Sequence, residues 1–349
     1  NNVVDDYAAA NVAQRCLDLI SKPLELVGRK FTPSCSIGVA HFPDDGADLQ
    51  TIIKAADTAL YAAKDLGKNR YSFYNKALTE KAEYRFKIEQ YLREAIEKQQ
   101  LSLVYQPKID MKTGSIVGVE ALSRWNHPIL GQVSPVVFIS MAEQIGMIKP
   151  LTEWVLKTAC KQSVVWSNAG YSSMLMAINI SPIHFLDSEL VSLIKQVILE
   201  TGIKPSELEL EVTEGVVQTT QDNLTVFEHL KELGILLAID DFGVGYSSFA
   251  SLKHLNVDYL KIDKYFIDDI LVDNKTKHLV GSMIEMGQNL GHKIVAEGIE
   301  KVEQLNLLKE LGCDNAQGYL FSKPVSAEQF LVLLSNDSIT QGKSDTNAL

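Results

Sequence analysis

The chain has 349 residues, a length typical of about two domains, and 46% of them are hydrophobic, enough for sizeable cores. Its formal net charge of −11 argues against electrostatic binding of nucleic acid polymers or anionic lipid over the surface as a whole. The four cysteines form no Cys-x-x-Cys pair and no apolar run approaches a membrane span in length, so we expect a reduced, cytoplasmic protein.

Residues 1–77 are predicted to form a small α/β unit. Apolar positions at helical spacing predict helices over residues 8–20 and 48–66. Short apolar runs bounded by turn residues predict strands over residues 35–40 and 71–74.

This unit resembles the second half of a GGDEF (diguanylate cyclase) domain. The matching stretches are Ser36-Ile37-Gly38-Val39-Ala40, Ala56-Asp57-Thr58-Ala59-Leu60-Tyr61-Ala62-Ala63-Lys64 and Gly67-Lys68-Asn69-Arg70-Tyr71. The hairpin that names the family would precede them, and the chain contains no Gly-Gly dipeptide. We therefore expect no cyclase activity from this unit as it stands, and a scaffolding or regulatory role with exposed apolar surface.

Residues 78–100 are predicted to form a connecting helix between two domains. They are rich in Glu, Lys, Arg and Gln, and one helical stripe carries Ile88, Tyr91, Leu92 and Ala95. The stripe predicts that this helix packs on the second domain.

Residues 101–334 alternate between strand-like and helix-like segments, which indicates a largely parallel sheet. Eight strands in such a length predict a TIM-type (β/α)8 barrel in the α/β class. The short turn at residues 110–115 leaves no room for a helix, so the barrel is expected to begin irregularly, with a partly antiparallel pair. The tail, residues 335–349, is polar and predicted to be disordered. The predicted strands span residues 103–109, 116–124, 174–180, 208–213, 235–240, 259–262, 293–296 and 315–318.

The fifth predicted strand ends in two adjacent carboxylates, Asp240 and Asp241, followed by Gly243 and Gly245. Taken alone, this stretch is more often a solvated acidic turn. The alternative is a metal site, because neighbouring carboxylates repel each other unless a cation lies between them, and oxygen ligands suit Mg²⁺ or Mn²⁺.

Polar residues at the other predicted strand ends favour the metal site. In a barrel these ends converge on one mouth, where so many carboxylates require counter-ions. Two divalent cations held side by side are a usual device for cleaving a phosphodiester. The residues at these ends are Glu120, Arg124, Asn179, Glu211, Glu214, Lys261, Asp263, Glu297, Glu300 and Gln317.

Taken together, these residues resemble those of the EAL-family cyclic di-GMP phosphodiesterases. The matching stretches are Tyr105-Gln106-Pro107-Lys108-Ile109, Glu120-Ala121-Leu122-Ser123-Arg124-Trp125, Asn179-Ile180-Ser181-Pro182, Glu211-Val212-Thr213-Glu214, Asp240-Asp241-Phe242-Gly243, Leu260-Lys261-Ile262-Asp263, Ala296-Glu297-Gly298-Ile299-Glu300 and Gln317-Gly318-Tyr319. The resemblance implies hydrolysis of cyclic di-GMP to linear pGpG in bacterial signalling. It also implies dependence on Mg²⁺ or Mn²⁺, with two ions, and inhibition by Ca²⁺.

The resemblance also implies residue roles. Catalysis would involve Glu120, Lys261, Glu297 and Gln317, with Lys261 orienting or deprotonating the attacking water. The metal ligands would be Glu120, Asn179, Glu211, Asp240, Asp241 and Glu297. Substrate contacts would come from Gln106, Leu122, Arg124, Phe321 and Pro324, with Asp263 beside the metals. Glu214 and Glu300 would anchor the loop after Asp241.

Three loop residues depart from the family pattern without removing a proposed ligand: Val244 and Lys301 where Thr is frequent, and Gly215 where Ser is frequent. The resemblance further implies a homodimer formed through the barrel. The chain begins at Asn1 without Met, which leaves room for an upstream sensor or membrane segment in a longer protein. Two alternatives stay open: a non-catalytic cyclic di-GMP receptor, and an enzyme held inactive by its N-terminal unit.

Overall fold

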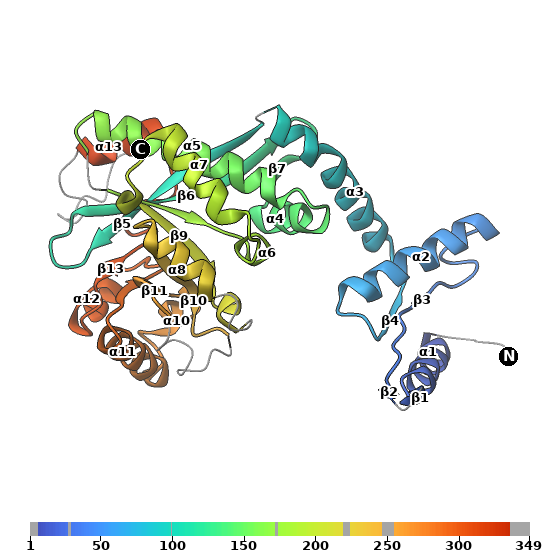
Figure 1. Ribbon diagram of the computed structural model, residues 1–349. Helices are drawn as coiled ribbons and strands as arrows, with labels where there is room; N and C mark the ends of the chain where they lie inside the picture. The colour runs from blue at the N-terminus through green and yellow to red at the C-terminus, as the bar shows by residue number, and fades with distance from the viewer. Residues whose placement is uncertain are drawn as a thin grey trace, which may run out of the picture. The chain divides into compact units, whose positions relative to one another are not determined.

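The computed structural model describes residues 6–26, 29–98, 100–171, 174–218, 224–245 and 255–335 (Figure 1). The chain divides into two compact units, Asn1–Tyr91 and Leu92–Leu349. Within the described ranges, no helix combines the length and the apolar character needed to cross a membrane. The tail that was predicted to be disordered lies outside the described residues, apart from Ser335.

The first unit is built around a parallel pair of short strands. Gly38 in the first of these strands lets the second helix approach closely, since an added Cβ would collide with the backbone of Ala56 and Leu60. That helix buries Ala59 and Ala63 and begins at Asp48, whose side chain accepts a hydrogen bond from Thr51 N. The elements are α1 (Asp6–Ile20), the antiparallel hairpin β1 (Leu24–Leu26) and β2 (Arg29–Phe31), then β3 (Ile37–Val39), α2 (Leu49–Asp65) and β4 (Tyr71–Phe73).

Helix α3, Lys76–Glu97, runs from the end of the first unit into the beginning of the second. Leu92 and Ala95 on this helix are fully buried. Midway along this helix, Arg85 forms an ion pair with Asp65 of α2.

The second unit is a closed eight-stranded barrel, which confirms the predicted fold class. The strands follow one another around the ring in the order β5-β13-β12-β11-β10-β9-β8-β6, and β6 pairs back with β5. Strand β5 is antiparallel to both of its neighbours, and the other neighbouring pairs of the ring are parallel. The strands are β5 (Leu101–Asp110), β6 (Ile116–His127), β8 (Leu175–Asn179), β9 (Leu208–Thr213), β10 (Leu236–Phe242), β11 (Tyr259–Ile262), β12 (Lys293–Ala296) and β13 (Asn315–Ala316).

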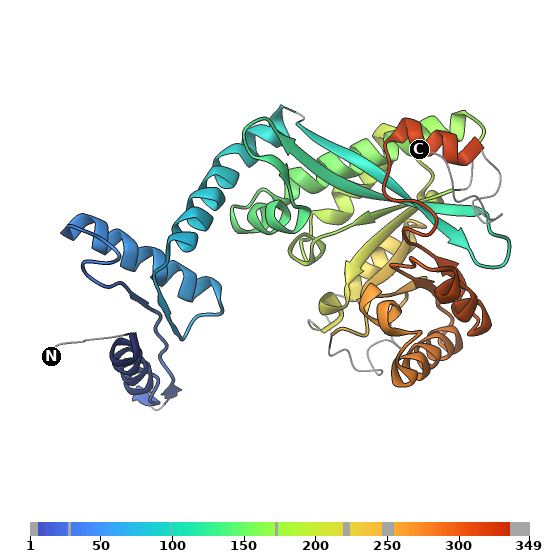
Figure 2. The same cartoon turned by 180° about the vertical axis from the view of Figure 1, so that it is seen from behind.

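The antiparallel start follows from the tight turn between β5 and β6, the two long strands that are clear in Figure 2. Asp110 Oδ1 accepts hydrogen bonds from Lys112 N at 2.9 Å and Thr113 N at 2.7 Å, and Gly114 has a φ of 74°. A parallel pair needs a long crossover connection, so this turn permits only an antiparallel pair. A short strand that was not predicted, β7 (Gly131–Val133), adds to the outer end of β6.

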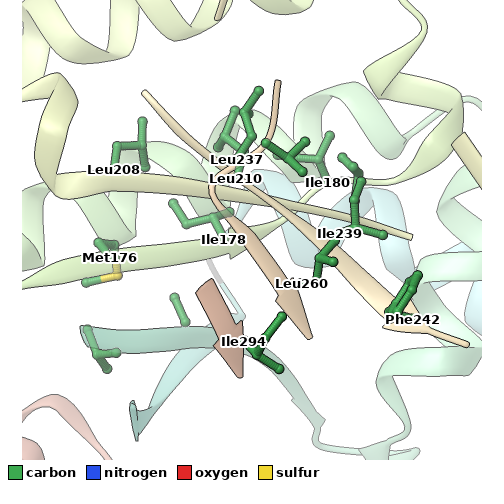
Figure 3. Close-up of a cluster of buried hydrophobic side chains, with 14 of the residues drawn as sticks. Met176, Ile178, Ile180, Leu208, Leu210, Leu237, Ile239, Phe242, Leu260 and Ile294 are labelled. Atoms are coloured by element: carbon green, nitrogen blue, oxygen red, sulfur yellow. The ribbon is translucent and has the colours of Figure 1, made fainter. Parts of the chain in front are cut away.

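Helices cover the outside of the barrel and bury its outward-facing side chains (Figure 1). Alternate strand residues such as Ile178, Leu210, Ile239 and Leu260 form this core, as Figure 3 shows. The helices are α4 (Pro135–Gln144), α5 (Ile148–Asn168), α6 (Pro182–Phe185), α7 (Leu190–Thr201), α8 (Leu224–Glu232), α10 (Lys264–Asp269), α11 (Asn274–Asn289), α12 (Val302–Glu310) and α13 (Ala327–Ser335), with 3-10 turns η1 (Pro205–Glu207) and η2 (Glu214–Gln218).

The residues between these outward positions point into the barrel. At the amino ends of the parallel strands they are mainly apolar, with Ala238, Tyr259 and Val295 in contact and Leu175 and Leu236 beside them. Towards the carboxyl ends the inward positions are polar. The alternation of the strands therefore brings polar groups together at one end of the barrel, which we call the mouth.

Candidate active site

Lys261 lies at the centre of the mouth, with its side chain only 1% exposed. Its Nζ atom is 2.6 Å from Glu211 Oε2 and 2.7 Å from Glu297 Oε1. Asp240 Oδ1 is 3.2 Å away and Glu120 Oε1 is 4.0 Å away. These five residues form the Lys261 cluster, and they come from five different strands or strand ends.

Glu120 is held by two amides. Asn179 Nδ2 donates to its Oε1 at 2.6 Å, and Gln317 Nε2 donates to its Oε2 at 2.6 Å. Gln317 Nε2 also lies 3.2 Å from Gln106 Oε1, while Gln106 Nε2 donates to Ser322 O at 3.1 Å. The four side chains thus form one network that joins β6, β8 and β5 to the residue directly after β13.

The prediction that Glu120 lies near the end of its strand was wrong in detail, because β6 continues to His127. The pairing of β6 with β8 covers only Gly118 to Ala121, however. Beyond that point β6 leaves the barrel and pairs with β5 and β7. Glu120 therefore lies where the barrel part of the strand ends, and this position depends on tertiary pairing rather than on strand length.

A bulge brings the neighbouring residues Asp240 and Asp241 to the same mouth. In a regular strand, adjacent side chains point to opposite faces. Here the pairing of β10 with β11 shifts between Ile239 and Phe242, and Asp241 has a φ of 54°, in the left-handed region that Asp tolerates better than most residues. Asp241 N donates to Asp240 Oδ1 at 3.0 Å.

Asp241 lies beside Asp263, the residue after β11. Partial burial, then the charges of Asp240 and Asp263, raise the pKa of Asp241 to about 6. Asp263 also begins α10, because its Oδ1 accepts a hydrogen bond from Tyr265 N at 2.8 Å. A second acidic pair thus lies next to the Lys261 cluster.

The Lys261 cluster is short of positive charge. Burial disfavours the ammonium, but the surrounding carboxylates, led by Asp240 and Glu120, raise the pKa of Lys261 well above its ordinary value. Burial, and then the charges of the neighbouring carboxylates, raise the pKa of Glu120 and of Glu297, although Lys261 opposes these shifts. An added cation would therefore be strongly stabilised here.

The oxygens of the mouth suit a hard divalent cation, and Gln317 Oε1 is a buried oxygen without a hydrogen-bond partner among the described residues. In the described residues, no three His, Cys, Asp or Glu side chains are already arranged to hold a metal ion. Lys261, Asn179 and Gln317 donate hydrogen bonds to carboxylate oxygens of Glu211 and Glu120. The residue types fit metal binding.

Two further buried charges lie below the cluster, and the sequence analysis had not singled them out. Lys108 Nζ is 2.6 Å from Glu209 Oε1 and 2.5 Å from Glu211 Oε1. Burial raises the pKa of Glu209 to about 7, whereas Lys108 and Lys261 overcome the effect of burial and lower the pKa of Glu211 to about 2. The alternation Leu208-Glu209-Leu210-Glu211 was the available signal, since it places both Glu side chains inside the barrel.

Of the residues predicted to contact substrate, Gln106 belongs to the network around Glu120, and the others lie on β6 or in the segment after β13. Leu122 and Arg124 are half-buried on β6, and an Arg124 guanidinium nitrogen donates to Ser123 O at 2.8 Å. Phe321 packs against the core from the segment after β13, and Pro324 is half-buried in the same segment.

Glu214 contacts the start of the loop after Asp241. It is buried, and its Oε2 accepts hydrogen bonds from Gly243 N at 3.0 Å and Gly245 N at 3.1 Å. Val244 between them is exposed. Glu300 is half-exposed and pairs with Lys264 Nζ at 2.8 Å. The rest of the predicted loop, from residue 246 onward, lies outside the described residues.

Comparison with known families matches residues 89–324 to the EAL domain and residues 2–70 to the diguanylate cyclase, GGDEF domain. Over 324 residues the chain is 39% identical to the bifunctional diguanylate cyclase/cyclic di-GMP phosphodiesterase MucR of Pseudomonas aeruginosa, covering 93% of this chain and 47% of that protein. It is 37% identical to the cyclic di-GMP phosphodiesterase NbdA of the same organism, covering 95% of this chain and 43% of that protein. The chain thus spans less than half the length of either relative.

Solved structures show the same barrel. A structure described as the PaMucR phosphodiesterase in complex with c-di-GMP superposes with a TM-score of 0.68 and 40% identity, covering 70% of this chain and 99% of that chain. The EAL enzyme Bd1971, in a form with cAMP and cyclic di-GMP bound, gives a TM-score of 0.68 and 33% identity, covering 73% of this chain and 70% of that chain.

Proposed function

The chain belongs to the EAL domain family, and on that premise we propose that it is a metal-dependent phosphodiesterase that hydrolyses cyclic di-GMP to linear pGpG. Two relatives named as cyclic di-GMP phosphodiesterases and a solved domain in complex with that dinucleotide support the substrate. The observation that carries the proposal is the Lys261 cluster, where four carboxylates surround one buried ammonium at the barrel mouth.

The cations in this proposal are two Mg²⁺ or Mn²⁺ ions, with Ca²⁺ as an inhibitor. When bound, they supply Lewis-acid stabilisation of the phosphoryl oxygens and activation of water. Their ligands would be the oxygens of Glu120, Asn179, Glu211, Asp240 and Glu297, and Asp241 would serve the second ion with Asp263 beside it. The bulge at Asp241 supports this assignment, because it brings two consecutive carboxylates to one mouth.

The chain's own residues would orient the reactants. Hydrolysis to pGpG forms a bond between phosphorus and a water oxygen and breaks the bond from phosphorus to a ribose 3′ oxygen, which receives a proton. Lys261, held as an ammonium by the carboxylates around it, would orient the attacking water by donating a hydrogen bond. Gln317, whose Oε1 finds no hydrogen-bond partner in the part of the chain that the structure describes, would accept from that water or join the metal ligands.

Substrate binding would use the outer part of the mouth. Arg124 is the cation suited to a phosphate oxygen, since a guanidinium makes strong charge-assisted hydrogen bonds. Gln106 and Leu122 lie on the neighbouring strands β5 and β6, and Phe321 and Pro324 would contact a guanine. A homodimer formed through the barrel completes the proposal, and sedimentation velocity tests it.

The direct experiment incubates the protein with cyclic di-GMP and Mg²⁺ or Mn²⁺ and follows pGpG by chromatography. We expect product with either cation, none after chelation, and none from Glu120→Ala. The competing function is a receptor that binds cyclic di-GMP without cleaving it. Tight binding without pGpG would establish that alternative, and turnover by Glu120→Ala would refute the assignment of the site.

A further inference from the structure

A second layer of buried charge lies below the Lys261 cluster. Lys108 is 2% exposed, and both of its carboxylate partners, Glu209 and Glu211, are fully buried. Its Nζ is 2.6 Å from Glu209 and 2.5 Å from Glu211. Burying three charges is costly, and apolar residues of similar size often give equal or better stability, so stability alone gives no reason for this triad.

The contact crosses the interior of the barrel. Lys108 is on β5 and the two glutamates are on β9, and β6 and β8 separate these strands around the ring. The strand residues paired with this contact are small. Gly118 pairs directly with Lys108 in the β5–β6 ladder, and Ala177 pairs with Glu209 in the β8–β9 ladder.

Glu211 is the link between the two layers. Its Oε1 accepts from Lys108, and its Oε2 accepts from Lys261 at 2.6 Å. Each oxygen therefore has a different lysine as its partner, and this fixes the rotation of the carboxylate about its axis. Without Lys108, the lower oxygen would have no partner, and the carboxylate would be free to turn both oxygens towards the mouth.

We propose that Lys108, held in place by Glu209, is a positioning residue that sets the orientation of Glu211 for cation binding at the mouth. This inference rests on the proposed metal-dependent function. Residues that orient a metal ligand in this way commonly contribute 10–100-fold to metal affinity or activity, so the effect is expected to be about that size. The competing explanation is that the triad only fills the barrel interior.

The test replaces the pair without changing the net charge. In Lys108→Met/Glu209→Met we expect Mn²⁺ affinity, measured by calorimetry without substrate, to fall about 10–100-fold. At saturating Mn²⁺, kcat for cyclic di-GMP should fall while KM changes less than about 2-fold, because the substrate contacts are untouched. The matched control is Lys204→Met/Glu207→Gln. It removes another ion pair, in which Lys204 Nζ lies 2.9 Å from Glu207 Oε1, in the segment that precedes β9. This control should bind Mn²⁺ like the wild type.

Unchanged Mn²⁺ affinity in the folded double variant would overturn the inference, and so would a wild-type protein that binds no Mn²⁺. If the double variant fails to fold, Glu209→Gln decides, because it keeps the side-chain shape but leaves Lys108 with one carboxylate. Mn²⁺ affinity should then fall by less than the roughly 10–100-fold expected for the double variant, and an unchanged affinity would overturn the inference. A wild-type protein that binds Mn²⁺ but yields no pGpG would refute the proposed function, while the comparison of Mn²⁺ affinities would still decide the role of Lys108.

Discussion

Replacement of Lys261 by Met should destabilise the barrel unit in a way that divalent cations reverse. The ammonium is the counter-charge that contacts four carboxylates, at 2.6 to 4.0 Å from Nζ. Removing it leaves the carboxylates of Glu120, Asp240 and Glu297 facing one another without this counter-charge, while Glu211 keeps its ion pair with Lys108. Loss of one partner from a buried ion pair costs about 3–5 kcal/mol, and for a unit of this size that corresponds to a fall in Tm of about 6–20 °C.

Mn²⁺ should restore more stability to Lys261→Met than it adds to the wild type. A ligand at about 100 times its Kd stabilises the folded state by about 2.7 kcal/mol. In the variant, the same oxygens surround a more negative site, so the cation binds more tightly and the gain is larger. Turnover should stay low even with Mn²⁺, because the group that orients the water is missing.

Thermal unfolding followed by circular dichroism, with chelator or with Mn²⁺, measures both effects. Lys231→Met is the matched control, because Lys231 pairs with Asp258 at 2.7 Å in a partly exposed position, and its loss should cost about 0–1 kcal/mol. A Tm for Lys261→Met equal to that of the wild type in chelator would refute the electrostatic reasoning. An equal or smaller shift with Mn²⁺ in the variant would refute the assignment of this cluster to cation binding.

Three other substitutions give separate tests. Gly318→Ala should cost about 1–3 kcal/mol of unfolding free energy, because the added Cβ would collide with the backbone of Ile299; unchanged denaturant stability would contradict this packing. Burial lowers the pKa of His184 from 6.5, so below about pH 6.5 the unfolded chain takes up a proton that the folded chain disfavours, and stability falls. In His184→Gln, the unfolding free energy from denaturant titrations should therefore fall less between pH 7.5 and pH 5.5 than in the wild type. The same fall in both proteins would contradict this role of His184. Arg124→Ala should raise KM for cyclic di-GMP, because it removes a hydrogen bond to a charged phosphate oxygen that contributes about 1.5–3 kcal/mol of binding free energy. An unchanged KM would exclude a phosphate contact.

Much of the barrel followed from the sequence because strand alternation is a local property. The repeated strand–helix segments and the short turn at residues 110–115 predicted both the barrel and its antiparallel start. The place of Lys261 and Glu211 at the ends of predicted strands assigned both to the barrel mouth. The structure brings these two together at the mouth, 2.6 Å apart.

Features set by tertiary pairing were not predictable in the same way. Strand β7 has three residues and forms because β6 extends past the barrel and offers it a partner. The left-handed backbone at Asp241 depends on the shifted pairing with β11, which no pattern in residues 235–240 reveals. Lys108 lies in a stretch that reads as an ordinary strand, and its partners are more than 100 residues away in the sequence.

The most direct test of the central claim follows one sample through binding and cleavage. Cyclic di-GMP is first bound in the presence of chelator, Mn²⁺ is then added in excess, and pGpG is measured over time. The proposed function predicts that pGpG appears only after Mn²⁺ is added, and that Glu120→Gln binds the dinucleotide but leaves it intact. Cyclic di-GMP that stays bound and uncleaved by the wild type at saturating Mn²⁺ would contradict the account.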